Sequence, residues 1–152
     1  MCIIFIGVSQ SNKVVGKYQN HFGQTLQINQ DSTFVSIWNF HLGESWISGK
    51  WRIKNDTIYF KIIPILDTIR SQGNMDKLIL SVNQKPELIV EENFSISHLM
   101  SNYIQNQHGL DTILFYENDR LYSISRKGKL IKKKRPFMSD KKFDPWFIKK
   151  EN

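Results

Sequence analysis

The residues in this chain that are best suited to bind a ligand are aromatic. Four of them lie within a stretch of about twenty residues in which apolar and polar side chains alternate: Trp38, Trp46, Trp51 and Tyr59. Aromatic side chains commonly line apolar ligand cavities. They also commonly fill the core of a β domain. Core packing is the favoured interpretation, and the wall of a ligand site is the functional alternative, in which these four residues are the candidate ligand-binding residues.

A second candidate site is a run of basic residues near the C-terminus. It consists of Lys132, Lys133, Lys134 and Arg135. Lysine clusters bind the phosphates of nucleic acids or anionic membrane surfaces, and aromatic residues such as the later Phe143 and Trp146 could stack on bases. The competing interpretation is a charged strand end, followed by a tail whose aromatic residues dock on the body of the protein.

The charge of the chain is unevenly distributed. Residues 1–125 hold 10 basic and 11 acidic side chains, whereas residues 126–152 hold 11 basic and 3 acidic ones. The body is therefore close to neutral, and the C-terminal segment accounts for the net charge of +7. The second functional hypothesis below therefore places an anionic partner on that segment.

No group of residues predicts catalysis, a cofactor or a metal site. Cys2 is the single cysteine, and no two of the four histidines have helical or strand spacing. The adjacent Glu91 and Glu92 would point to opposite faces of a strand, so they could not flank one glycosidic bond. The eight glycines are isolated, which excludes a phosphate-binding glycine loop. We therefore predict that the protein is not an enzyme.

The elements that must position the aromatic residues are predicted to be β-strands. Residues 50–54 and 57–62 alternate between apolar and polar side chains, and Asn55-Asp56 between them suits a tight turn. Similar pairs occupy residues 24–38 and 112–131. The chain also contains no alanine, the best helix former. We predict an all-β fold, an antiparallel meander that forms a barrel or sandwich of about eight strands.

One window has helical periodicity. The apolar residues Ile96, Leu99, Met100 and Tyr103 are spaced to share one helical face. A short helix near residues 96–107 is therefore predicted, with a loop as the alternative.

The first residues resemble the end of a secretory signal. Residues 1–8 are apolar, and Ser9-Gln10-Ser11 gives a small-x-small cleavage pattern before Asn12. A buried first strand is the alternative. We predict a signal-peptide remnant at 1–11, a single β domain at 12–135 and a basic, aromatic tail at 136–152 that packs on the domain or extends from it. The expected location is periplasmic or secreted, with a cytoplasmic location as the alternative.

The N-terminal third resembles the small lipocalin-like β-barrel domains of exported bacterial proteins. The resemblance rests on Gly16-Lys17-Tyr18, on Asp31-Ser32-Thr33-Phe34, on Gly49-Lys50-Trp51 and on the Asn55-Asp56 turn before Thr57-Ile58. Tyr18 stands where lipocalins carry a tryptophan. Arg126 is the positional candidate for the arginine that packs on that tryptophan. The resemblance implies a barrel and a location in the bacterial envelope rather than a reaction.

These observations lead to two functional hypotheses. The first is a non-catalytic exported domain that binds a small apolar ligand or an envelope protein, without a transmembrane segment. The second is a cytosolic module that binds nucleic acid or another anionic partner through the basic C-terminal segment. Export would make nucleic acid an unexpected partner.

Overall fold

The computed structural model describes residues 12–40, 43–71, 73, 75–90, 103–136 and 140–151. The predicted signal remnant at 1–11 and residues 96–102 of the predicted helix lie outside this part of the chain. No helix within the described residues is long and apolar enough to cross a membrane.

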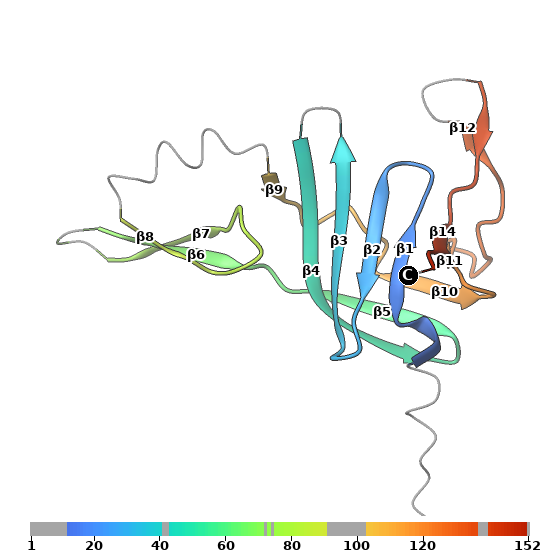
Figure 1. The fold of residues 1–152 in the computed structure, drawn as a ribbon, viewed down its shortest axis with the longest axis horizontal. Helices are drawn as coiled ribbons and strands as arrows, with labels where there is room; N and C mark the ends of the chain where they lie inside the picture. Colours follow the sequence, from blue (N-terminus) through green and yellow to red (C-terminus); the bar gives the residue numbers. More distant parts are fainter. Residues whose placement is uncertain are drawn as a thin grey trace, which may run out of the picture.

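Eight antiparallel strands form a closed barrel (Figure 1). They are β1 (Gly16–Gln19), β2 (Gln24–Ile28), β3 (Thr33–Phe40), β4 (Gly43–Lys54), β5 (Thr57–Ile62), β10 (Ile113–Glu117), β11 (Arg120–Ser123) and β14 (Phe147–Lys149). The strand order is β3-β2-β1-β14-β11-β10-β5-β4, and the pairing of β4 with β3 closes the ring. The all-β antiparallel prediction is confirmed, and the barrel rather than the sandwich is the architecture.

The predicted hairpin around Asn55-Asp56 is present. Both residues have positive φ values, 50° and 58°, which asparagine and aspartate tolerate better than most residues. Asn118 and Asp119 form the corresponding turn between β10 and β11, with φ values of 51° and 58°. A two-residue turn with positive φ at both central residues has a backbone twist that matches the twist of the two strands it joins.

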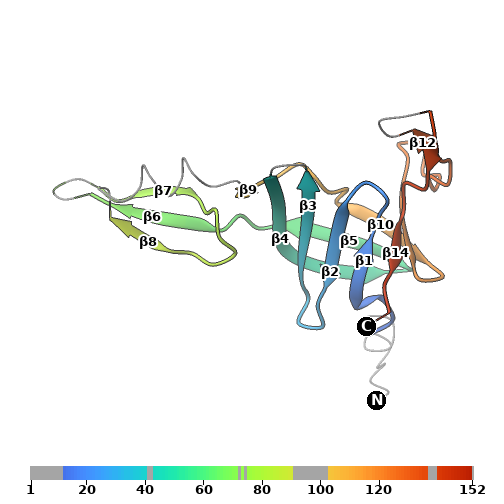
Figure 2. The ribbon, with the colours of Figure 1, turned by 45° about the horizontal axis from the view of Figure 1, so that its top comes forward.

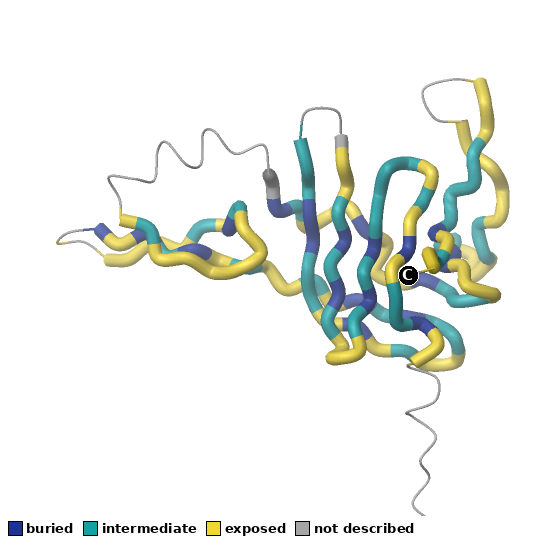
Figure 3. The backbone as a smooth tube through the Cα atoms, in the orientation of Figure 1, coloured by how far each residue is buried: buried dark blue, intermediate teal, exposed yellow. Residues whose placement is uncertain are grey.

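Alternate side chains of the barrel strands fill its interior. Figure 3 shows buried positions alternating with half-buried ones along β2 and β3. The interior cluster is built from large apolar residues of every barrel strand, including Tyr18, Leu26, Ile28, Phe34, Ile47, Trp51, Ile58, Phe60, Leu114, Leu121 and Phe147. Burying alternate residues is what the period-two sequence pattern encodes.

One end of the barrel is closed by the chain that enters β1. Residues 12–14 form a helical turn, and Val14 is fully buried. The Tyr18 hydroxyl donates a 2.8 Å hydrogen bond to the Val14 carbonyl, and Lys149 Nζ donates to the Lys13 carbonyl at 2.7 Å. We call this the closed end.

The stability of the barrel is expected to fall as the pH rises above about 10, the ordinary pKa of tyrosine. Burial raises the pKa of Tyr18 above that value, so the folded state holds its phenol proton while the unfolded chain releases it. The Tyr18→Phe variant should lose about 1 kcal/mol for the missing hydrogen bond. It should also show a shallower alkaline decline. Urea unfolding at neutral and alkaline pH measures both effects, and an unchanged alkaline slope would contradict this assignment.

A second, three-stranded sheet projects from the barrel between β5 and β10 (Figures 1 and 2). It comprises β6 (Leu66–Arg70), β7 (Lys77–Leu80) and β8 (Leu88–Val90), in the order β7-β6-β8. Strand β9 (Tyr103–Gln105) then returns to the barrel and pairs in parallel with β4. Residues 103–105 of the helix predicted at 96–107 therefore form a strand instead.

The C-terminal segment contributes to the barrel. After β11 the chain forms the two-stranded pair β12 (Arg135–Pro136) and β13 (Lys142–Phe143). It then continues into β14, which lies between β1 and β11. Removing residues 126–152 would thus remove one strand of the closed ring.

Candidate ligand-binding site

A pocket of about 350 Å³ lies at the end of the barrel opposite the closed end. Its lining comes from strand ends and loops that meet there: Asn20, Phe22, Gln24, His108, Gly109, Leu110, Asp111, Ser123, Ile124, Ile131, Arg135, Pro145 and Phe147. Small eight-stranded barrels can hold one small ligand, and pockets of this volume are within the range of small-molecule sites. We call it the mouth pocket.

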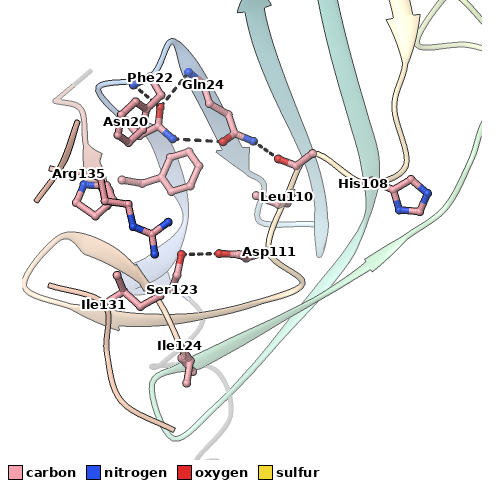
Figure 4. A pocket seen from close by; sticks show the side chains of 13 residues that line it. Asn20, Phe22, Gln24, His108, Leu110, Asp111, Ser123, Ile124, Ile131 and Arg135 are labelled. Atoms are coloured by element: carbon pink, nitrogen blue, oxygen red, sulfur yellow. Dashed lines mark hydrogen bonds between the residues drawn. The ribbon is translucent and has the colours of Figure 1, made fainter. Parts of the chain in front are cut away.

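The rim of the mouth pocket is held by two amide side chains. Asn20 Oδ1 accepts hydrogen bonds from the backbone N–H groups of Phe22 and Gln24, both at 3.0 Å. Gln24 Nε2 donates to Ser36 Oγ at 3.1 Å and to the Gly109 carbonyl at 2.9 Å. These bonds fix the β1–β2 turn and connect it to the loop that precedes β10 (Figure 4).

A carboxylate and a guanidinium are the charged groups that line the pocket. Ser123 Oγ donates a hydrogen bond to Asp111 Oδ2, which orients that carboxylate. The exposed Arg135 side chain reaches from β12 toward Ser123 and Asp111, whereas the His108 ring points away from the other lining side chains (Figure 4). The pocket therefore offers a guanidinium donor and a carboxylate acceptor beside apolar walls.

The apolar walls lie deeper than the charged groups. Leu110 and Phe147 are buried, and Phe22, Ile124 and Ile131 are half-buried. Phe147 also belongs to the interior cluster, so the floor of the pocket is the top of the barrel core. A ligand would contact apolar side chains below and charged groups at the entrance.

The four predicted wall residues do not line one cavity. Trp51 is buried inside the barrel, where its Nε1 donates to the Asn29 carbonyl at 2.9 Å. Trp46 is 1% exposed but faces the projecting sheet, and its Nε1 donates to the Val82 carbonyl at 3.3 Å. Tyr59 lies on the outer wall, with the Arg52 guanidinium 4.6 Å from its ring centre.

Trp38 is the predicted wall residue that lies near the mouth pocket. Its Nε1 donates a 2.9 Å hydrogen bond to the carbonyl of Phe22, a lining residue, and 37% of its surface is exposed. Its indole is thus coupled to the rim and accessible to solvent. Trp38 is a natural fluorescent reporter for a ligand in this pocket.

The structure separates the members of the predicted basic run. Lys132 pairs with Glu117 and lies over the ring of Tyr122, 4.8 Å from its centre. Lys134 Nζ lies 3.5 Å from Asp144 Oδ1, and Lys133 is exposed. Arg135 lines the mouth pocket. Two of the four cations therefore have acidic neighbours.

Sequence reasoning did not find the residues of the mouth pocket other than Arg135. Asn20 and Asp111 lie in polar stretches at the ends of strands and carry no periodic signal. The available clue was the placement of polar residues where predicted strands end, because the ends of barrel strands converge at a mouth.

No protein-family model matches the chain, and neither the search of curated proteins nor that of solved structures gave a match. Within the described residues, no three histidine, cysteine, aspartate or glutamate side chains are grouped so that they could hold a metal ion.

Proposed function

We propose that the protein is a non-catalytic binding domain that holds a small molecule in the mouth pocket. The observation that carries the proposal is the pocket itself, an opening of about 350 Å³ above a filled barrel core. Sites of this kind combine apolar walls with a few polar groups that fix the orientation of the ligand. A relationship to lipocalin-like domains and export from the cytoplasm are parts of the same proposal.

The lining favours an amphipathic ligand. The apolar body would lie on Leu110 and Phe147, and an acidic head group would meet the Arg135 guanidinium. Arginine binds carboxylates through paired, charge-assisted hydrogen bonds, which are stronger than neutral ones. Asp111, oriented by Ser123, would accept a hydrogen bond from a hydroxyl or amine of the ligand. A small amphipathic carboxylate is the ligand class that uses all of these groups.

The test is a titration with medium-chain fatty acids and aromatic carboxylates, monitored by tryptophan fluorescence. We expect the emission of Trp38 to change on binding, and Trp38→Phe to remove the change without removing the binding measured by calorimetry. Arg135→Gln should weaken carboxylate binding by about tenfold, equivalent to about 1.4 kcal/mol. Lys133→Gln removes the same charge outside the pocket lining and serves as the matched control.

Two results would contradict this assignment. One is binding that is equally weakened by Lys133→Gln, because only a general charge effect would then be present. The other is binding unaffected by Ile131→Trp, which places a large side chain in the pocket.

The alternative function, binding of nucleic acid or another anionic partner by the basic run, is ranked second. The acidic neighbours of Lys132 and Lys134 reduce the charge that they offer to a partner. Since β14 is one strand of the closed ring and lies between β1 and β11, this alternative is tested by substitution in the basic run rather than by truncation.

A further inference from the structure

The outer face of the β4–β5 hairpin carries a cluster of cations. Trp51 and Phe60 lie opposite each other and point into the barrel, so their neighbours along each strand point outward. Four of the outward residues of these strands are basic and exposed: Lys50, Arg52 and Lys54 on β4 and Lys61 on β5. We call these four residues the basic wall.

The basic wall contains a like-charge pair that folding does not explain. Lys50 lies directly opposite Lys61 in the antiparallel register. Like charges in this position destabilise a sheet. None of the four cations forms an ion pair with an acidic side chain in the part of the chain that the structure describes. The repulsion between them is therefore not relieved within the described protein.

Apolar and aromatic side chains adjoin the basic wall. The Tyr59 ring lies beneath the Arg52 guanidinium, and Tyr59 is in register with Ile113 on β10. Ile113 is 42% exposed, and half-buried Phe115 follows it on the same outer face. A shallow hollow of about 390 Å³ lies over this part of the hairpin and is lined by Lys50, Trp51, Arg52, Tyr59, Phe60 and Lys61. Cations thus border an exposed apolar strip on the outside of the barrel.

We propose that the basic wall docks the protein on an anionic lipid bilayer. The lysine and arginine head groups would contact lipid phosphates, while Tyr59 and Ile113 enter the interfacial region. Basic residues near an anionic membrane each contribute favourable electrostatic energy, and their aliphatic stems can lie along apolar surface. Charge complementarity selects an anionic partner, and the exposed aliphatic Ile113 favours a bilayer over a nucleic acid, because an isoleucine can enter the interfacial region but cannot stack on a base.

This docking site is separate from the mouth pocket. None of the lining residues of the pocket belongs to the basic wall. Failure of carboxylate binding at the pocket therefore leaves the docking proposal standing, and failure of docking leaves the pocket standing.

The experiment is co-sedimentation with vesicles of phosphatidylcholine containing about 30 mol% phosphatidylglycerol, compared with pure phosphatidylcholine. We expect binding to the anionic vesicles alone, weakened by added salt. The double variant Lys50→Gln/Lys61→Gln should lower the partition coefficient by about thirtyfold, since each cation near the surface contributes about fivefold. The matched control Lys127→Gln/Lys129→Gln removes the same charge from an exposed turn and should lower it by less than about threefold.

The unfolding temperature of the double variant provides a second measurement. Because it removes a like-charge pair, it should unfold at the same temperature as the wild type or higher. Weaker binding by a variant of equal or greater stability excludes misfolding as the cause. Ile113→Ser should reduce the binding that persists at high salt.

Three outcomes would overturn the proposal. The first is an equal loss of vesicle binding in the control variant. The second is no preference for anionic vesicles. The third is binding to a single-stranded oligonucleotide that depends on Lys50 and Lys61 while vesicles are not bound, which would assign the basic wall to nucleic acid.

Discussion

Replacing Gly49 with alanine is expected to lower the free energy of unfolding by about 3 kcal/mol. A Cβ atom at this position would overlap the Lys61 carbonyl oxygen and would lie 2.9 Å from the Lys61 carbonyl carbon and 3.0 Å from Ile62 Cα. All three are backbone atoms of the neighbouring strand. They cannot move aside without disturbing the β4–β5 ladder, whose register pairs Gly49 with Ile62. Glycine is required here because the two backbones approach closely.

The comparison variant is Gly128→Ala. Gly128 has a φ of 73°, but a Cβ there would meet no atom within 4 Å. Its substitution therefore strains only the backbone conformation and should cost about 1 kcal/mol. Urea denaturation of both variants separates the two effects. If Gly49→Ala costs no more than Gly128→Ala, the close approach of β4 to β5 is not what determines the residue at this position.

Alternation in the sequence predicted the hairpins but not the closure of the barrel. The Asn55-Asp56 turn and its flanking strands were predictable because the turn and the period-two pattern are local. A sandwich buries alternate residues as well, so alternation could not distinguish the two architectures. Closure depends on the pairing of β14 with β1, in which Lys149 lies opposite Tyr18. The two strands are more than 120 residues apart in the sequence. Such a long-range pairing has no local signal.

The aromatic residues of the predicted site do not all share one face of the sheet, because successive side chains along a strand point to opposite faces. Trp46 and Trp51 both belong to the twelve-residue strand β4. They are five positions apart, an odd number, so they face opposite sides of the sheet. Tyr59 is adjacent to the inward Phe60 and therefore points outward. Proximity in the sequence was a poor guide to a shared cavity.

The polar groups of the mouth pocket could not be predicted because they meet only in the folded chain. Gln24 bonds to Gly109 across 85 residues, and Ser123 bonds to Asp111. Gln24, Ser123 and Asp111 are each ordinary polar residues at or near a strand end, and Gly109 contributes only its backbone carbonyl. The basic run was visible in the sequence, but the acidic neighbours Glu117 and Asp144 that lower its charge were not predictable for the same reason.

Gln105→Leu is expected to loosen the three-stranded sheet from the barrel. Gln105 is 7% exposed, and its side-chain amide holds the chain where the two sheets join. Nε2 donates to the carbonyls of Ile65 and Ser81, at 2.8 Å and 3.1 Å, and Oε1 accepts from the Ile65 N–H at 2.9 Å. Leucine has similar size but makes none of these bonds. The Ile65 carbonyl keeps its bond from the Ser81 N–H, so the Ile65 N–H and the Ser81 carbonyl are the backbone groups that lose a partner. Each such loss costs about 1–3 kcal/mol.

The loss should be local, because the barrel ladder closes without the projecting sheet. Hydrogen exchange should accelerate at the Ser81 amide, which donates to the Ile65 carbonyl at 2.9 Å, and should be unchanged at barrel amides such as that of Leu121. The emission of Trp46 should shift to longer wavelength, since its indole bonds to Val82 beside the junction.

Gln107→Leu, two residues further along in an exposed position, is the matched control. Equal exchange rates at Ser81 in wild type and Gln105→Leu would show that the sheet is held by other contacts. Faster exchange in the barrel as well would show that the two sheets unfold as one unit.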